Sequence, residues 1–226
     1  MRFKVLFFGK KNDVFSEIFF KILKKNFYKV TALWNYNKNK KTLDKILLKG
    51  NVDFIFSFRS HYIFKKEIFS KVRKYAINFH PGPPEYRGVG CVNFAIFNKS
   101  KYYGATAHII NKNIDQGKIL LVNKFLINPK DTIKKILTKT YFIQIKQLNI
   151  LINLLKNNKN NLDALLKKKY SWSKKLYKRK DLEKLYSIKK NISRKKLQLQ
   201  LKATNFKNFS PYINLYGNKF YYEKKR

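Results

Sequence analysis

The sequence has 226 residues, more than one compact core needs, which favours one main domain with a smaller appendage. Hydrophobic residues form 44% of the chain and aromatic residues 16%, so a disordered chain is excluded. Lysine and arginine total 52 against 12 acidic residues, and the formal net charge of +40 attracts nucleic acid, anionic lipid and anionic metabolites alike.

Lysine supplies nearly all of this charge, because arginine occurs at only seven positions. Surfaces that read phosphate groups favour arginine, whose planar fork binds two phosphate oxygens at once. The composition is instead typical of an AT-rich genome. A non-enzymatic, basic RNA-binding protein is the alternative from another class, because aromatic residues interleave with lysine at residues 212–222.

The N-terminal half alternates strand-like and helix-like segments. An apolar run at residues 3–8 ends at Gly9, a helix is expected at 14–25 and a second strand at 29–34. The alternation continues with a helix at 43–48, a strand at 52–56, a helix at 63–74 and a strand at 75–79. This order predicts a doubly wound α/β fold with a mostly parallel sheet and helices on both faces.

The loop after the first strand argues against two common cofactors. It contains Gly9 alone where a dinucleotide-binding loop needs three glycines, and the sequence has no Gly-Lys-Ser or Gly-Lys-Thr loop. We therefore expect neither NAD nor ATP to bind.

The cellular compartment is suggested by what the sequence does not contain. Cys91 is the only cysteine, which excludes an intrachain disulfide and a cysteine-based metal site and favours a reducing cytoplasm. The apolar run at 5–8 is too short for a signal peptide, and polar residues interrupt the apolar region at 141–155. We expect no membrane span and no metal.

The C-terminal half predicts two more strands, at 105–110 and 119–122, and a long amphipathic helix at 131–155. A lysine- and asparagine-rich stretch at 156–161 predicts a domain boundary, with a catalytic domain at 1–160 and a small α+β appendage at 161–226. Within the appendage we expect a helix from Ser193 and a hairpin of strands 212–216 and 219–222, joined by Gly217-Asn218.

The most informative segment begins with Asn78 and His80 at the end of the strand at 75–79. Side chains alternate along a strand, so these two polar groups point to the same face, at the edge where such sheets bind ligands. The following loop, Pro81-Gly82-Pro83-Pro84, is stiff. Rigid backbone beside convergent donors is typical of an active site.

A second segment places an acid where it can act on His80. The strand containing Thr106 and His108 leads to a turn at Asp115-Gln116-Gly117. A carboxylate near His80 would hold the ring in one orientation and favour its protonated form, which suits acyl transfer.

These two segments resemble the formyltransferase family that uses 10-formyltetrahydrofolate and includes methionyl-tRNA, glycinamide-ribonucleotide and sugar-amine enzymes. The resemblance covers about residues 1–155. Its motifs are an Asn-x-His-Pro turn, a Gly-x-Thr-x-His strand and an Asp-x-Gly turn, found here in order at Asn78/His80, Gly104/Thr106/His108 and Asp115/Gly117.

The resemblance implies a role for each residue. Asn78 and His80 bind the formyl oxygen, and Asp115 positions His80 and helps to move the proton of the amine. The folate lies along the loop of Gly82, Pro83 and Pro84. Thr106 and His108 support the site, and no metal is implied.

The length of the proline loop bears on the acceptor. The loop reaches Arg87-Gly88 one residue sooner than in the tRNA and purine branches, as in the sugar-amine branch, and the short tail around Trp172 resembles that branch too. This favours the amine of a nucleotide-linked sugar, with methionyl-tRNA as the alternative acceptor. The oligomeric state is left open, with a homodimer among the alternatives.

Several residues near these motifs have a structural interpretation. We expect Glu85 and Arg87 to form a salt pair at the rim rather than to contact substrate. Cys91 is expected to be a small buried residue, and His61 a surface or helix-entry residue.

Overall fold

The computed structural model of the chain describes residues 1–35, 51–157, 161–166, 170–206 and 209–223. Its main feature is a six-stranded sheet in the order β2-β1-β3-β4-β6-β7. Strands β1 to β4 are parallel, and β6 and β7 add an antiparallel edge beyond β4. This confirms the predicted mostly parallel α/β fold. The strands are β1 (Lys4–Gly9), β2 (Lys29–Trp34), β3 (Phe54–Phe58), β4 (Tyr75–His80), β6 (Tyr102–Ile109) and β7 (Ile119–Leu126).

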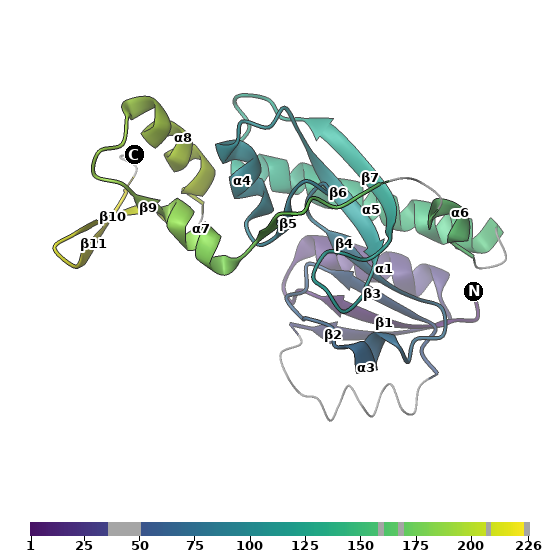
Figure 1. Cartoon of the computed structure of the whole chain (residues 1–226). Helices are drawn as coiled ribbons and strands as arrows, with labels where there is room; N and C mark the ends of the chain where they lie inside the picture. The colour runs from purple at the N-terminus through teal and green to yellow at the C-terminus, as the bar shows by residue number, and fades with distance from the viewer. Residues whose placement is uncertain (36–50, 158–160, 167–169, 207–208, 224–226) are drawn as a thin grey trace.

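Helices α1 (Val14–Asn26) and α5 (Ile133–Asn157) cover one face of the sheet (Figure 1). Helix α1 begins after Asp13, whose side chain accepts a backbone N–H of the first turn at 2.9 Å and so caps the helix. Along β3, Phe56 belongs to the core under these helices, whereas its neighbour Ile55 belongs to the core on the opposite face. This strand is therefore buried on both sides.

The opposite face packs against α3 (Lys66–Phe69) and the chain that leads into it. Phe8 of β1 meets Phe64 edge-on, with ring centroids 4.7 Å apart. Together with Ile68 they complete a second apolar layer beneath the sheet.

The predicted helix at 63–74 is wrong in length, because α3 has only four residues. The backbone after α3 forms hydrogen bonds with the segment directly before β3 instead of continuing the helix. Arg73 N–H donates to the Val52 carbonyl and Lys74 N–H to the Asp53 carbonyl, each at 3.0 Å. The Arg73 guanidinium also lies 2.8 Å from the Asp53 carboxylate. These contacts align the chain for β4 before a second helical turn can form.

Other boundaries also differ from the prediction or cannot be compared with it. Strand β6 begins at Tyr102 rather than at 105, and β7 continues to Leu126 rather than ending at 122. Strand β3 covers Phe54–Phe58 rather than 52–56, because Ser57 and Phe58 still pair with β4. The helix predicted at 43–48 lies outside the described residues.

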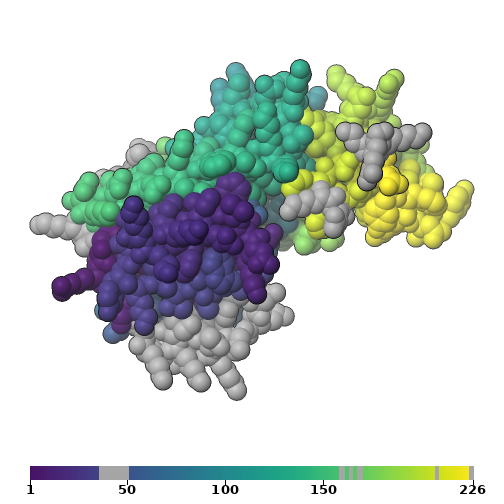
Figure 2. Space-filling view, turned by 180° about the vertical axis from the view of Figure 1, so that it is seen from behind, coloured from purple at the N-terminus to yellow at the C-terminus, as the bar shows by residue number. Residues whose placement is uncertain are grey.

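The C-terminal part packs against the end of the sheet where the short helix α4 (Cys91–Phe97) lies. Helix α8 (Arg194–Thr204) begins after Ser193, as predicted, and contacts α4, where Asn93 Nδ2 donates to the Ala203 carbonyl at 2.7 Å. In Figure 2 the C-terminal part, coloured yellow-green to yellow, forms a lobe at the opposite end of the molecule from the N-terminus. The remaining elements are β5 (Arg87–Gly88), α6 (Asp163–Leu166), β8 (Leu176–Tyr177), α7 (Arg179–Tyr186), β9 (Ser187–Ile188), β10 (Tyr212–Leu215) and β11 (Asn218–Tyr221).

The predicted hairpin forms, but its turn is Tyr216-Gly217 rather than Gly217-Asn218. Both turn residues have positive φ, 50° and 81°, and Leu215 pairs directly with Asn218. A two-residue hairpin turn of this type needs positive φ at both positions, which Tyr216 adopts here despite its side chain. The predicted domain boundary at residue 160 lies outside the described residues, and the division into two domains stays a prediction.

Candidate active site

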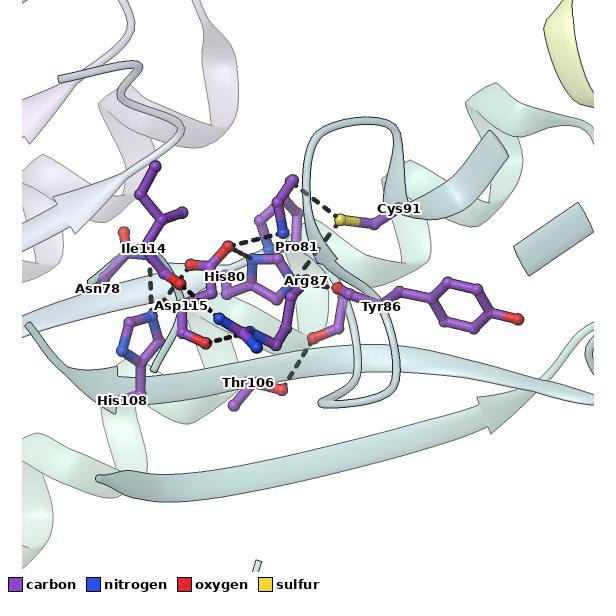
Figure 3. Close-up of polar contacts among 12 residues, drawn as sticks. Asn78, His80, Pro81, Tyr86, Arg87, Cys91, Thr106, His108, Ile114 and Asp115 are labelled. Carbon is purple, nitrogen blue, oxygen red and sulfur yellow. Dashed lines mark hydrogen bonds and ion pairs between the residues drawn. The ribbon is translucent and has the colours of Figure 1, made fainter. Parts of the chain in front are cut away.

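The candidate site lies where β4 ends beside β6. Asn78 pairs with His108 and His80 with Thr106 across these antiparallel strands. Between them, Phe79 points into the core under α1 and α5, so Asn78 and His80 project from the other face. Figure 3 shows the His80 side chain beside Asp115 and the Asn78 side chain beside His108.

His80 is held by contacts at both ring nitrogens. Nδ1 lies 3.3 Å from Asp115 Oδ2, and Nε2 donates to the Tyr86 carbonyl oxygen at 2.7 Å. Burial alone would lower the pKa of this ring, which is only 2% exposed, but the negative charge of Asp115 raises it to about 9. Since both nitrogens face acceptors, His80 is a protonated imidazolium at neutral pH.

Asp115 is the centre of the cluster. Its Oδ2 also accepts the Gly88 backbone N–H at 2.9 Å, and its Oδ1 lies 3.4 Å from His108 Nε2. Burial would raise the pKa of this carboxyl group, but His80, His108 and the Gly88 N–H hold it well below its usual range. The residue has φ of 46°, a left-handed conformation that aspartate tolerates and that turns the carboxylate toward both rings.

His108 links this carboxylate to Asn78. Asn78 Nδ2 lies 3.1 Å from His108 Nε2, and His108 Nδ1 lies 2.9 Å from the Ile109 carbonyl oxygen. The turn fits under this ring only with Gly117, because a Cβ there would come within 1.5 Å of the Ile109 carbonyl oxygen. The structure therefore joins Asn78, His80, His108 and Asp115 in one network.

The proline loop is folded tightly onto His80. Its carbonyl oxygens accept hydrogen bonds from side chains. The Pro81 carbonyl accepts from the Tyr103 hydroxyl at 2.6 Å, and the Gly82 carbonyl accepts from the Thr106 hydroxyl at 2.8 Å. Gly82 approaches so closely that a Cβ would lie 2.8 Å from His80 Nε2. Gly82, Pro83 and Pro84 of this loop are buried. That Gly82, Pro83 and Pro84 contact folate stays a prediction.

The expected rim salt pair between Glu85 and Arg87 is wrong. Glu85 pairs with Lys124, whereas Arg87 is only 3% exposed. The Arg87 guanidinium donates to three backbone carbonyls, those of Ile114 at 3.1 Å, Asp115 at 2.8 Å and Ser173 at 2.8 Å. The short strand β5 turns this side chain inward, so that it fastens the Asp115 turn to the C-terminal part of the chain.

Two further residues lie against the histidines. Trp172 was not predicted to belong to the site, because nothing in its sequence spacing connects a residue of the tail with the strands. Its Nε1 donates to the Gly117 carbonyl at 2.8 Å, and its ring meets those of His80 and His108 edge-on. Cys91 is buried, as expected, and its sulfur lies 3.7 Å from His80 Nε2.

The geometry agrees with what related sequences show. The pattern described as Formyl transferase matches residues 9–155. The chain belongs to the formyl transferase family. Two curated relatives are the bifunctional polymyxin resistance protein ArnA of Wigglesworthia glossinidia brevipalpis and the methionyl-tRNA formyltransferase of Borreliella burgdorferi strain ZS7.

These relatives are matched over part of their length. The first is 34% identical over 66% of this chain and 23% of its own length, and the second is 35% identical over 42% of this chain and 34% of its own length. The chain thus spans about a quarter and about a third of the two relatives it matches.

Solved formyltransferases of the family share the fold over nearly the whole chain. A sugar N-formyltransferase from a Shewanella species has a TM-score of 0.75 at 23% identity and covers 98% of this chain and 97% of its own. An N-formyltransferase from Helicobacter canadensis, solved in complex with folinic acid and dTDP-3-aminofucose, has a TM-score of 0.73 at 21% identity and covers 96% and 86%. The C-terminal elements are therefore part of the shared architecture.

The described residues also bear on metal binding and on membrane insertion. Within these ranges, no group of three or more His, Cys, Asp or Glu side chains is arranged to hold a metal ion. Among the helices in the same part of the chain, none is long and apolar enough to cross a membrane.

Proposed function

We propose that this protein transfers the formyl group of 10-formyltetrahydrofolate to a primary amine. The observation that carries the proposal is the buried network in which Asp115 keeps His80 protonated beside Asn78. A charged ring and an amide at the end of a sheet strand can stabilise the negative oxygen that develops when an amine attacks a formyl carbon.

The roles proposed for the three residues are those that the family resemblance implies. The neutral amine attacks the formyl carbon, and the oxyanion accepts hydrogen bonds from Asn78 Nδ2 and His80 Nε2, each worth about 3 kcal/mol of barrier. His80 Nε2 donates to the Tyr86 carbonyl in the structure, so the substrate oxygen takes the place of that acceptor. Loss of the amine proton and cleavage of the bond to folate N10 complete the transfer.

Asp115 supports this chemistry by position. Its carboxylate oxygens face His80, His108 and the Gly88 N–H, and it remains charged. The proton of the amine reaches solvent or the leaving nitrogen through this hydrogen-bonded cluster, with Asp115 holding the ring that takes part.

We propose a nucleotide-linked amino sugar as the acceptor. The short loop before Arg87 supports it, and so does the fold shared with a Helicobacter canadensis enzyme described with dTDP-3-aminofucose. Initiator methionyl-tRNA is the second candidate, favoured by the relative from Borreliella burgdorferi. A cytoplasmic location and a homodimer belong to the same proposal.

The test is a coupled assay with 10-formyltetrahydrofolate, a panel of nucleotide-linked amino sugars and, separately, initiator methionyl-tRNA. We expect a sugar amine to be formylated, His80→Ala to abolish transfer, and the matched variant His61→Ala to leave it unchanged, because His61 is exposed and outside the network. Formylation of the tRNA alone would replace the sugar as acceptor. Salt-sensitive RNA binding that survives loss of Asn78 and His80, with no transfer to any amine, would favour the RNA-binding alternative.

A further inference from the structure

A segment from the C-terminal part, residues 170–178, crosses back over the candidate site. In Figure 1 it runs past β7 and β6 to α7, and its strand β8 pairs in parallel with β5. Ser173 fastens it at one point, donating its N–H to the Pro84 carbonyl at 3.0 Å and accepting from Arg87 at 2.8 Å. Tyr177 fastens it at another, accepting the Val89 N–H at 2.9 Å.

This crossing segment brings Trp172 into contact with three parts of the site. Its ring lies edge-on to His80, with centroids 5.6 Å apart and planes at 77°, and edge-on to His108, at 5.0 Å and 87°. Its indole N–H donates to the carbonyl of Gly117, two residues after Asp115. One side chain therefore contacts both histidines and the turn that carries their shared carboxylate.

Burial indicates which side of the cluster Trp172 occupies. His80, His108 and Asp115 are 2%, 3% and 8% exposed, whereas Trp172 is only half-buried. The partly exposed Trp172 ring packs on the buried rings of His80 and His108, so it lies between them and water.

We propose that Trp172 is a positioning residue for the reaction: it holds the His80 and His108 rings against Asp115 and closes this side of the cluster to water. The inference rests on the proposed function, and it makes the crossing segment part of the active site. Misplacing a reacting group by about 1 Å costs on the order of 100-fold in rate, so a side chain that never touches substrate can still control turnover.

The two tryptophans of the chain provide a matched comparison. Trp34 packs on Phe7 and Phe20, with centroids 5.6 and 5.4 Å apart, and belongs to the core at the other edge of the sheet. We therefore compare Trp172→Leu with Trp34→Leu, and add Trp172→Phe, which keeps an aromatic ring but loses the N–H that reaches Gly117.

For Trp172→Leu we expect kcat to fall roughly 10- to 100-fold with little change in either KM. Trp172→Phe should recover part of this loss, and Trp34→Leu should lower the melting temperature without a comparable fall in kcat. A kcat within twofold of the unaltered protein in Trp172→Leu would overturn the proposal.

A second measurement does not depend on turnover. The Cε1 hydrogen of each histidine exchanges slowly with deuterated solvent and is followed by mass spectrometry, with the exposed His61 as an internal reference. We expect His80 and His108 to exchange several-fold faster in Trp172→Leu but not in Trp34→Leu. Unchanged exchange would overturn the role of Trp172. An unaltered protein that formylates no acceptor would instead count against the proposed function.

Discussion

Two ion pairs, one partly exposed and one buried, lie where neighbouring strands of the sheet end, and they differ in what their cations can do. Arg59, directly after β3, places Nε 3.1 Å from Asp13 Oδ1, with the two side chains 14% and 13% exposed. His80, at the end of β4, pairs with Asp115, with side chains 3% and 9% exposed. In each pair one member has positive φ, Arg59 at 55° and Asp115 at 46°.

The nature of the cation distinguishes a pair that serves the structure from a pair that can take part in chemistry. The Arg59 guanidinium stacks over the Tyr141 ring, 3.8 Å from its centroid, and its charge is permanent. The His80 ring can gain and lose a proton, and its two nitrogens face the Asp115 carboxylate and the Tyr86 carbonyl oxygen. Neighbouring strands thus use similar local geometry for anchoring in one case and for chemistry in the other.

The largest effect should come from removing the titratable cation. We expect His80→Gln to lower kcat by about 10³-fold, because it removes the charged donor to the oxyanion. The melting temperature should fall as well, because the buried Asp115 carboxylate loses the cation beside it, although glutamine retains a donor toward the Tyr86 carbonyl. Steady-state kinetics of the purified variant measure this, and activity above a tenth of the original would contradict it.

Breaking the other pair should affect stability without affecting the chemistry. Arg59→Met leaves the partly buried Asp13 without its cation, and we expect the free energy of unfolding to fall by about 2 kcal/mol in urea titrations. The double variant Arg59→Met, Asp13→Asn should recover part of that loss. If kcat of the folded single variant dropped as far as in His80→Gln, the distinction between the two pairs would be lost.

The pH dependence of stability and of kcat/KM should also distinguish the His80–Asp115 pair from the Arg59–Asp13 pair. Because the pKa of His80 is raised to about 9 in the folded protein, its contribution to stability is complete below the ordinary value of 6.5 and is lost as pH rises through 9. We expect kcat/KM to decline on the alkaline side with an apparent pKa near 9, and Asp115→Asn to move that decline to lower pH. An alkaline limb unaffected by Asp115→Asn would contradict the assignment.

Helix α5 supports both pairs, which allows a smaller and more local test. Gln144 Nε2 donates to the Phe79 carbonyl at 2.7 Å, between Asn78 and His80, and Tyr141 lies one turn earlier under Arg59. We expect Gln144→Leu to lower stability by about 1 to 2 kcal/mol and kcat by less than tenfold. Tyr141→Leu should cost about 1 kcal/mol and leave kcat unchanged. Equal kinetic effects of both variants would argue against this division.

The sequence predicts the parts of the site that are local. Asn78 and His80 are two residues apart on one strand, and Asp115 and Gly117 form one turn, so alternation and turn chemistry suffice to relate them. That His80 and Asp115 meet follows from the resemblance to a family and from the sheet topology, and the structure places them together.

The parts that escaped prediction depend on distant backbone. The partners of Arg87 are carbonyl oxygens, which every residue has, so no motif identifies them. Helix α4 was missed because it is buried on nearly all sides and shows no amphipathic period. The helix at 63–74 was overestimated because its backbone N–H groups bind Val52 and Asp53, far earlier in the chain.

The crossing segment has a consequence for how the protein is made. Arg87 and Ser173 are 86 residues apart, yet their bond fastens the turn that carries Asp115. While the ribosome is still adding those residues, the sheet can form from strands already synthesised, but the histidine cluster has neither Ser173 nor Trp172 over it. The nascent chain should therefore acquire its α/β core first and a competent site only when its final quarter has docked.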